Sequence, residues 1–458
     1  MRLVSTLAVL LLSGSSFSPA QDAPPPDDRY RFAAGRSQEQ AVTVEATSDG
    51  ARFAWTPPRG DWDTALLGVR VTAAVADPRV EFSAGTARAT AYIDAAARGL
   101  RWLNLTGLRS GLREAGVVEA RGLGVTFEPG PAVVRTFANA LDLSRPILIV
   151  APHPDDAEIA AFGLYAGRNA TIVTVTSGNA GDANYVADFP DPAQQYLFKG
   201  YLRAVDSVTV PWQGGIPPER CFNLGYFDAR LRTMREKSGE VVPELYGPNQ
   251  DVAPYRRANI GRLLPVGSRT NSWPHLVEDL VAVLDKVKPA IVVAPHPYLD
   301  YHADHRYATV ALVEALERWK KPATFLLYTN HADKNLYPYG PAGAGVSLPP
   351  TGLSLPAWAA AADLPVQGVY SHPVSADLQR RKLYALETMH DLRLSPVEQG
   401  ACGDPNAPRR PDYPRVGAVD YFRRGPRADE VFFVFDRDGV RDLVRAFVAG
   451  DMPAAPKP

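Results

Sequence analysis

The order of apolar and polar residues divides the chain into two parts with different periods. Between about residues 41 and 137, short runs alternate apolar and polar side chains and are separated by turn residues. The clearest runs are 41–45, 51–55, 69–71, 101–105 and 124–127. An alternation of period two, repeated at this spacing, predicts a β-sandwich-like antiparallel N-terminal domain. Its aromatic residues, such as Trp102, either stack on a sugar or fill the core.

From about residue 145 the pattern changes to continuous apolar runs that alternate with segments of helical spacing. The apolar runs are 147–151, 171–175, 290–294 and 324–328, and the helical segments are about 155–166, 193–206, 274–287, 304–318 and 376–390. Strands that are apolar on both faces are typical of a parallel sheet covered by helices. The second part is therefore predicted to be α/β, with a mostly parallel, Rossmann-like sheet and helices on both faces. In such sheets ligands bind beyond the carboxyl ends of the strands.

The first 20 residues have the features of an export signal. The ten-residue apolar run Leu3 to Leu12 is too short to span a bilayer, and Ser18 and Ala20 supply the small residues of a cleavage site. A buried strand or an uncleaved anchor is the alternative for this segment. We expect an exported, periplasmic or secreted protein without a transmembrane segment. The predicted organisation is a signal peptide at 1–20, a β-rich domain at 21–143, an α/β domain at 144–448 and a flexible tail at 449–458.

Composition narrows the classes of partner. The 458 residues include 49 Lys and Arg against 50 Asp and Glu, so the formal net charge is −1. Without a basic excess to neutralise phosphates, nucleic acid is not expected to bind. Cys221 and Cys402 are the only cysteines, and they form either one disulfide in an oxidising compartment or two unpaired core thiols.

Two apolar strands are each followed directly by a group of His and Asp residues. Pro-His-Pro-Asp-Asp occupies 152–156, and Asp-Tyr-His-Ala-Asp-His occupies 300–305. Taken alone, the first group could be a turn that caps a helix, and the second could be a surface cluster at a helix start. Because both follow buried strands at equivalent ends, we interpret them together as one site.

The residue types in these two groups fit a catalytic metal site. Such a site takes three imidazole or carboxylate ligands and leaves one position open, and His153, Asp156 and His305 can supply that set. Adjacent carboxylates on a turn cannot both face one ion, which leaves Asp155 to accept a proton from the attacking water. His302 is one helical turn before His305, so it can lie near the metal without binding it.

Residues 151–158 resemble the signature of the PIG-L/LmbE-like zinc-dependent N-acetylglucosaminyl deacetylases, and residues 302–305 resemble the second metal motif of that family. Weaker similarity is present at 176–181, 224–228 and 382–390. The resemblance covers about residues 145–395 and leaves out the N-terminal part. One departure is visible, since the chain has Arg203 and Asp206 where the family usually has an Arg-x-x-Glu pair.

The resemblance implies a role for each residue of the two motifs. Asp155 matches the general base, His302 the residue that stabilises the oxyanion or protonates the leaving amine, and Asp304 the residue that orients His302. The implied metal ligands are His153, Asp156 and His305. Substrate contacts are expected at Arg203, Asp228 and Asn179.

We therefore expect a metal-dependent hydrolase that removes the N-acetyl group from an N-acetylglucosamine-containing sugar or glycoconjugate. The expected cofactor is Zn²⁺, although two His and one carboxylate also suit Fe²⁺ or another divalent metal. The alternatives are an amidase acting on another acylated amine and a glycan-binding protein without catalysis. The extra carboxylate of Asp155 argues against a binding protein, which has no need of it.

Overall fold

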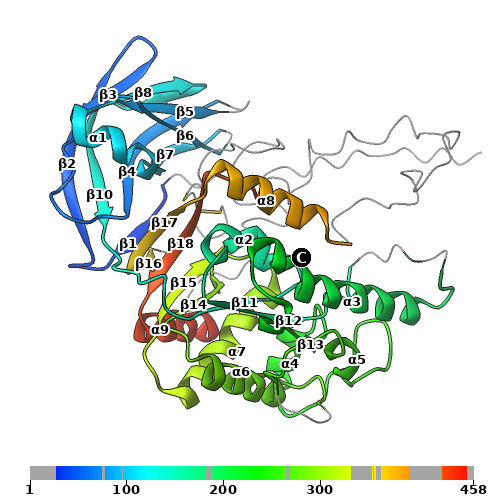
Figure 1. The fold of residues 1–458 in the computed structure, drawn as a ribbon. Helices are drawn as coiled ribbons and strands as arrows, with labels where there is room; N and C mark the ends of the chain where they lie inside the picture. Colours follow the sequence, from blue (N-terminus) through cyan, green and yellow to red (C-terminus); the bar gives the residue numbers. More distant parts are fainter. Residues whose placement is uncertain are drawn as a thin grey trace, which may run out of the picture.

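The computed structural model describes residues 27–74, 78–94, 96–181, 185, 188–264, 269–331, 353, 355–356, 363–390 and 425–450. The predicted signal peptide and Cys402 lie outside these residues, as does almost all of the predicted tail. Cys221 is buried, and both the disulfide with Cys402 and the two unpaired thiols stay open. No helix in the described ranges is long and apolar enough to cross a membrane. Figure 1 shows an N-terminal β region beside a larger region in which helices cover a sheet.

The N-terminal region is one antiparallel sheet of nine strands in the order β6-β5-β8-β3-β2-β10-β4-β7, with β9 paired to β4. Its elements are β2 (Ser37–Ala46), β3 (Gly50–Ala54), β4 (Thr64–Ala73), β5 (Arg79–Ala84), β6 (Ala87–Tyr92), β7 (Arg98–Asn104), η1 (Thr106–Leu108), α1 (Arg109–Ala115), β8 (Val117–Leu123), β9 (Val125–Phe127) and β10 (Gly130–Phe137). The predicted alternation is present, because Ala51 and Phe53 of β3 are buried while their neighbours Arg52 and Ala54 are exposed. The antiparallel strands are thus confirmed. The sandwich is not, because β2 pairs with β10 and also with β3 and so joins the strands into one path.

The larger region alternates strands and helices. Its elements are β11 (Ile147–Ala151), α2 (Asp156–Tyr165), β12 (Ala170–Thr176), α3 (Pro192–Thr209), η2 (Val210–Gly214), η3 (Pro218–Arg220), β13 (Cys221–Tyr226), α4 (Leu231–Glu236), α5 (Ala253–Arg256), α6 (Trp273–Val287), β14 (Ile291–Pro295), α7 (Ala303–Trp319), β15 (Thr324–Tyr328), β17 (Gly368–Pro373), α8 (Ala376–Glu387), β18 (Asp429–Phe435) and α9 (Arg437–Ala449). Two short strands, β1 (Tyr30–Phe32) and β16 (Leu364–Val366), pair in parallel and link the beginning of the described chain to this region.

The seven strands of the larger sheet have the order β13-β12-β11-β14-β15-β18-β17. The pairs from β13 to β15 are parallel, and β18 and β17 are antiparallel. The α/β class is confirmed, but a Rossmann-like arrangement is not, since β17 and β18 add an edge that the prediction did not include. The chain runs from β11 outward to β12 and β13, then returns to β14 on the other side of β11. Ligands of α/β sheets bind at such a reversal of strand order.

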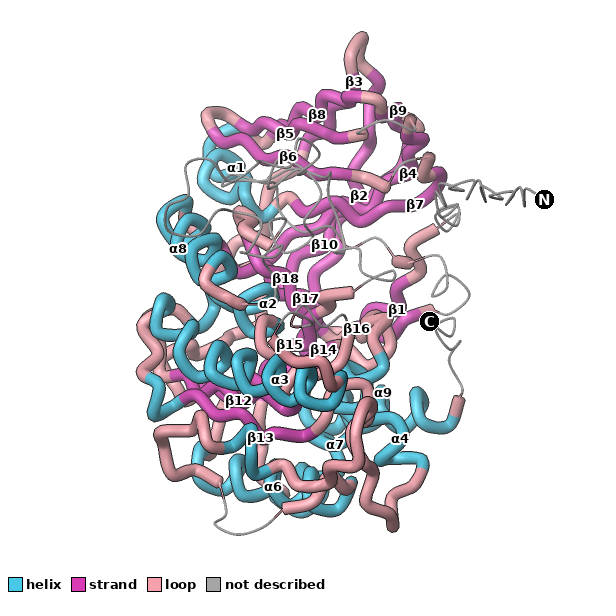
Figure 2. The backbone as a smooth tube through the Cα atoms, turned by 90° about the vertical axis from the view of Figure 1, so that its right-hand side faces the viewer, coloured by secondary structure: helices cyan, strands magenta, loops and turns pink. Residues whose placement is uncertain are grey.

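Helices cover both faces of this sheet. Leu148 and Val150 of β11 share a core with Leu280 of α6 and Leu312 of α7, whereas Ile149 faces α2 and α8 on the other side. Helix α6 buries Leu276, Leu280, Val283 and Leu284, the spacing of one helix face. Figures 1 and 2 show α2, α3 and α8 on one side of the strands and α4, α6 and α7 on the other.

The N-terminal sheet packs against the antiparallel edge of the larger sheet. Trp102 and Phe137 belong to the same core as Phe433 of β18. The Asn104 amide donates to Asp429 Oδ2 at 2.7 Å and to Ser371 Oγ at 3.0 Å, and all three residues are buried. Trp102 is only 8% exposed, so it fills the core and does not present a ring to a sugar.

We expect Trp102→Ala to destabilise both regions together. Removing a buried tryptophan typically costs about 3–5 kcal/mol, and here the cavity would open between the two sheets. Differential scanning calorimetry should show one transition at a lower Tm. Trp55→Ala is the matched control, because Trp55 lies in the separate N-terminal core. If the calorimetric trace showed two unfolding transitions and Trp102→Ala lowered the Tm of only one of them, the predicted boundary at 143/144 would separate two domains that unfold independently.

Candidate active site

The two His/Asp groups meet at the carboxyl ends of β11 and β14. Residues 152–155 form the turn from β11 into α2, and residues 296–302 form the loop from β14 into α7. Because β11 and β14 are adjacent and parallel, their carboxyl ends lie at one edge of the sheet. Residues that are about 150 positions apart in the sequence are therefore in contact, as the sequence analysis predicted.

Three predicted metal ligands form a compact triangle. His153 Nδ1 lies 3.1 Å from His305 Nε2, His305 Nε2 lies 3.1 Å from Asp156 Oδ2, and His153 Nδ1 lies 3.3 Å from Asp156 Oδ2. Tetrahedral ligands at about 2.0–2.1 Å from a zinc ion are about 3.3–3.4 Å apart. All three side chains are buried. The residues present thus fit a divalent cation of the zinc type.

The same cluster offers further sets of metal-binding atoms. In each of three triplets, the ligand atoms lie within 4.8 Å of one another. The triplets are His153, His302 and His305; Asp156, His305 and His331; and His153, Asp228 and Asp304. Each shares His153 or His305 with the triangle, so the described residues indicate one metal-binding region centred on these two imidazoles.

Charge is balanced within the triangle by buried partners. Burial alone would lower the pKa of His305, but the carboxylates of Asp156 and Asp300 raise it to about 9. Burial would raise the pKa of Asp156, but His305 and His153 hold it well below its usual range. A cation at this place competes with the imidazole protons, so metal binding here releases protons.

Two carboxylates and one amide orient the ligands from behind. Asp300 Oδ2 is 3.0 Å from His305 Nδ1, and Asp228 Oδ1 is 3.1 Å from His153 Nε2. The Asn330 side chain donates to Asp156 Oδ1 at 2.7 Å. Such partners fix the orientation of metal ligands and strengthen their binding.

The sequence analysis missed Asn330 and assigned no role to Asp300. Asn330 follows β15 by two residues, and β15 is the neighbour of β14 in the sheet. The rule that led to the two motifs, polar residues just beyond a buried strand, also applies to this position. The signal was therefore present in the sequence, although a lone Asn is too common after a strand to stand out.

We expect Asn330→Ala to weaken metal binding about 10–100-fold, the usual loss when a partner behind a metal ligand is removed. Competition with a chromophoric chelator measures this affinity. Asn169→Ala is the control, because Asn169 is exposed and precedes β12 at the opposite edge of the sheet. Equal affinities in the two variants would contradict a role for Asn330 in orienting Asp156.

Asp155 occupies a strained position beside the triangle. Its φ of 152° is rare for a residue other than glycine, and such strain costs about 1–3 kcal/mol and is concentrated at functional sites. Arg203 Nη2 donates to Asp155 Oδ2 at 3.0 Å and to the Pro154 carbonyl at 3.1 Å. Burial raises the pKa of Asp155 to about 7, although Arg203 acts to lower it.

A glycine allows Arg203 to approach this turn. Gly178 has a φ of 66°, and a Cβ at this position would lie 2.7 Å from Arg203 Nη1 and 2.9 Å from Pro154 Cδ. The Gly178 carbonyl accepts a hydrogen bond from Arg203 Nη1 at 3.0 Å. The guanidinium thus ties the loop after β12 to the turn after β11 and holds Asp155 in place.

His302 borders the triangle with its proton on a defined atom. Its ring lies 4.7 Å from the ring of His153, centroid to centroid. His302 Nδ1 accepts a hydrogen bond from the Asp304 backbone N–H at 3.3 Å, so the neutral ring carries its proton on Nε2. Burial and the nearby positive charge of His153 lower the pKa of His302 to about 4. His302 is thus placed as a neutral hydrogen-bond donor.

The Asp304 carboxylate contacts the loop before α4. It accepts the backbone N–H groups of Ala229 at 2.6 Å and Leu231 at 3.1 Å, and Oδ2 is 3.5 Å from His153 Nε2. The backbone N–H of Asp304 donates to His302 Nδ1. The carboxylate therefore holds the start of α4 against the site, and its predicted role in orienting His302 stays a prediction.

The three predicted substrate-contacting residues all have partners within the protein. Arg203 binds Asp155, and Asp228 Oδ2 accepts the backbone N–H of Ala180 at 3.2 Å in addition to its contact with His153. Asn179 Oδ1 accepts the backbone N–H of Asp228 at 3.1 Å. The structure brings all three to the edge of the triangle. Their contacts with a substrate stay a prediction.

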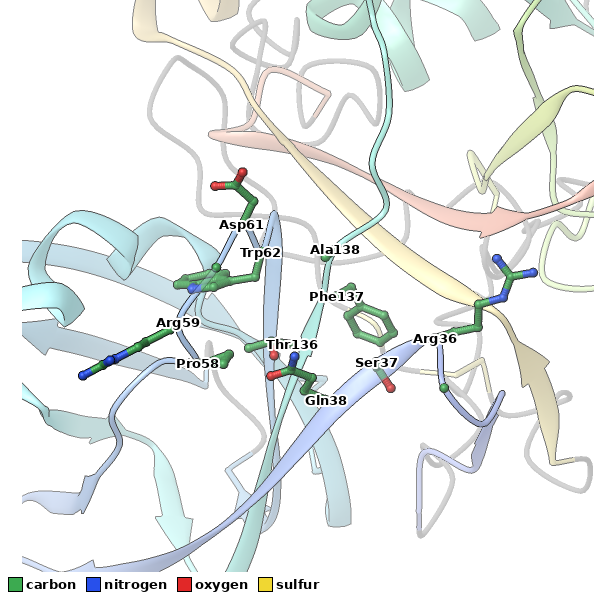
Figure 3. Close-up of a pocket in the computed structure, with 12 residues that line it drawn as sticks. Arg36, Ser37, Gln38, Pro58, Arg59, Asp61, Trp62, Thr136, Phe137 and Ala138 are labelled. Carbon is green, nitrogen blue, oxygen red and sulfur yellow. The ribbon is translucent and has the colours of Figure 1, made fainter.

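A pocket in the N-terminal region is separate from this cluster. It lies where the start of β2 and the end of β10 meet the loop at 58–62 (Figure 3). Its lining includes Arg36, Gln38, Asp61 and Phe137. It shares no lining residue with the His/Asp cluster and therefore does not form part of the candidate active site.

Comparisons with known proteins agree with the motifs. The family PIG-L, GlcNAc-PI de-N-acetylase, matches residues 148–316. A 1D-myo-inositol 2-acetamido-2-deoxy-alpha-D-glucopyranoside deacetylase of Nocardia farcinica is 28% identical over 201 residues, which are 40% of this chain and 57% of that protein. The chain thus spans little more than half the length of this relative.

Solved structures resemble the chain only weakly. For Dbv21, a deacetylase of the antimicrobial A40926 pseudoaglycone, the TM-score is 0.34 and the identity 15%, and the match covers 64% of this chain and 98% of the Dbv21 chain. For GalB, the 4-carboxy-2-hydroxymuconate hydratase of Pseudomonas putida, the TM-score is 0.25 and the identity 14%, and the match covers 40% of this chain and 65% of the GalB chain. Similarity at this level does not bear on activity. The resemblance noted in the sequence is confirmed by the family match, and residues 148–316 of this chain form a PIG-L (GlcNAc-PI de-N-acetylase) family domain.

Proposed function

We propose that this protein is an exported metal-dependent deacetylase that removes the acetyl group from an N-acetylated amino sugar or glycoconjugate. The observation that carries the proposal is the triangle of His153, Asp156 and His305 with the additional carboxylate of Asp155 beside it. Ligands alone would suit a structural ion. A buried carboxylate on a strained backbone next to three ligands suits hydrolysis, because it can take the proton of the attacking water.

Each residue of the cluster has a chemical role in this proposal. His153, Asp156 and His305 would hold a divalent cation, which would supply Lewis-acid chemistry. Asp155 accepts the proton of the water as the water oxygen bonds to the amide carbon, and Arg203 holds Asp155 Oδ2, which leaves Oδ1 for this proton. His302 Nε2–H donates to the oxygen on which negative charge develops. When the C–N bond breaks, the proton held by Asp155 passes to the nitrogen, so that acetate and the free amine leave.

The identity of the cation and the export are further parts of the proposal. Two imidazoles and one carboxylate at tetrahedral spacing suit Zn²⁺, and elemental analysis of protein purified without added metal tests this choice. Export through a cleaved signal would remove residues 1–20. N-terminal sequencing of the protein from its native host is expected to begin at Gln21, and a chain that begins at Met1 would contradict export through cleavage of this signal.

A screen for acetate release tests the activity. N-acetylglucosamine, chito-oligosaccharides, peptidoglycan fragments and N-acetylglucosaminyl lipids are incubated with the metal-loaded protein, and acetate is measured with an enzyme-coupled assay. We expect release from at least one of them, and its loss on addition of a chelator. Acylated amines that contain no sugar are included in the screen, and release only from them would support the amidase alternative. Binding without release from any compound would support a glycan-binding protein.

A further inference from the structure

His390 and Asp206 form a hydrogen-bonded pair close to the proposed active site. His390 Nδ1 lies 2.7 Å from Asp206 Oδ1, and the backbone N–H of His390 donates to Asp206 Oδ2 at 2.8 Å. Both carboxylate oxygens of Asp206 therefore contact His390. Asp206 is buried, whereas the side chain of His390 is 49% exposed.

The pair is connected to the base by a short chain of contacts. Asp206 is three residues after Arg203 on α3, so the two side chains leave the same face of the helix about 5–6 Å apart. Burial raises the pKa of Asp206, and the charges of His390 and Arg203 partly offset this rise. Arg203 in turn binds Asp155. His390 is thus linked to the base through Asp206 and Arg203, which lie on one face of α3.

The exposed imidazole, and not the buried carboxylate, is the group of this pair that a sugar can reach. Asp206 is 3% exposed, and each of its oxygens accepts a hydrogen bond from His390. With Nδ1 directed to the carboxylate, the ring is oriented and Nε2 is the nitrogen left to bind a ligand.

We propose that His390 is a specificity-determining residue that binds a hydroxyl group of the amino sugar through Nε2, oriented for this by Asp206. The inference rests on the proposed deacetylase function and adds a residue that recognises the sugar rather than the acetyl group. Asp206 is a positioning residue, because it acts only through the imidazole. The alternative is that the pair merely joins the end of α8 to α3.

Two amide substitutions separate the two nitrogens of His390. In His390→Asn, the amide nitrogen takes the place of Nδ1, so the bond to Asp206 is kept while Nε2 is removed. In His390→Gln, the amide reaches the place of Nε2. Both variants are made in the full chain, and Tm is measured to establish that the join between α8 and α3 is intact.

Steady-state kinetics on the best acetylated sugar of the screen should separate KM from kcat. We expect His390→Asn to raise KM about 3- to 10-fold, because the variant loses one hydrogen bond to the sugar. The values of kcat and Tm should stay close to those of wild type. His390→Gln should recover part of this loss. Deoxy analogues of the sugar identify the hydroxyl, since wild type and His390→Asn should have the same KM on the analogue that lacks it. His275→Asn, on α6, is the control histidine.

An unchanged KM for His390→Asn on the parent sugar and on every deoxy analogue would overturn the inference and leave the pair as a join between helices. The affinity of each variant for the acetylated sugars of the screen, measured by titration calorimetry, is independent of turnover. Binding without acetate release from any of them would refute the proposed function, and the affinities of wild type and His390→Asn would still decide the role of His390. Absence of binding by wild type to every one of these sugars would overturn both.

Discussion

Asp155→Asn is expected to lower kcat by about 10²–10⁴-fold while the protein keeps its metal. The substitution preserves the size of the side chain and its hydrogen bond with Arg203, but an amide oxygen cannot take a proton from water at neutral pH. Acetate release and metal content are measured on the same preparation. Metal content close to wild type distinguishes loss of the base from loss of the site.

Asp156→Asn provides the contrast on the neighbouring residue. Its carboxylate contacts both His153 and His305, and Asn330 donates to it, so this substitution is expected to lower metal content as well as activity. If Asp155→Asn turned over as fast as wild type, the hydrolytic mechanism would be wrong, and another base or the glycan-binding alternative would have to replace it.

His305→Ala should remove the metal almost completely. The triangle would keep only two ligands, and a two-ligand site does not hold a divalent ion against competition from buffer. Elemental analysis is expected to fall from about one ion per chain to near zero, with loss of acetate release. Asp300 would also lose its imidazole partner and remain a buried carboxylate.

His275→Ala is the control for this variant, because His275 lies on α6 and bonds to Thr270 outside the cluster. It should keep both metal and activity. A metal content for His305→Ala equal to that of wild type would place the ion in another of the ligand sets, of which His153, Asp228 and Asp304 is the one without His305.

The sequence alone predicted where the His/Asp cluster lies. The apolar runs at 147–151 and 290–294 predicted buried strands, which the structure has as β11 and β14, and the His/Asp groups directly follow them. The sequence is sufficient to place these groups at the ends of strands, because a strand and the turn after it are contiguous in the chain. Helices α2, α3, α6, α7 and α8 were predicted close to their observed bounds for the same reason, since helical spacing of apolar residues is a property of neighbouring positions. The short helices α4 and α5 were not predicted.

Tertiary structure decided which side chains assist the ligands. Asp228, Asn330 and Asp304 come from the ends of different elements, and their partners are 75 to 174 residues away in the sequence. Asp304 holds backbone N–H groups of the loop before α4, a contact that depends on where that loop passes. No local pattern tells which group each of these three side chains contacts.

The relation between the two regions was also decided by packing. Alternating strands predicted a sandwich, but a period of two does not say which strands pair, and β2 joins all nine into one sheet. The sequence pattern around Trp102 did not distinguish an exposed side chain from a buried one. Trp102 is buried because the N-terminal strands pack against the antiparallel edge that β17 and β18 add to the larger sheet. This contact joins residues that are far apart in the chain, so only the tertiary structure determines it.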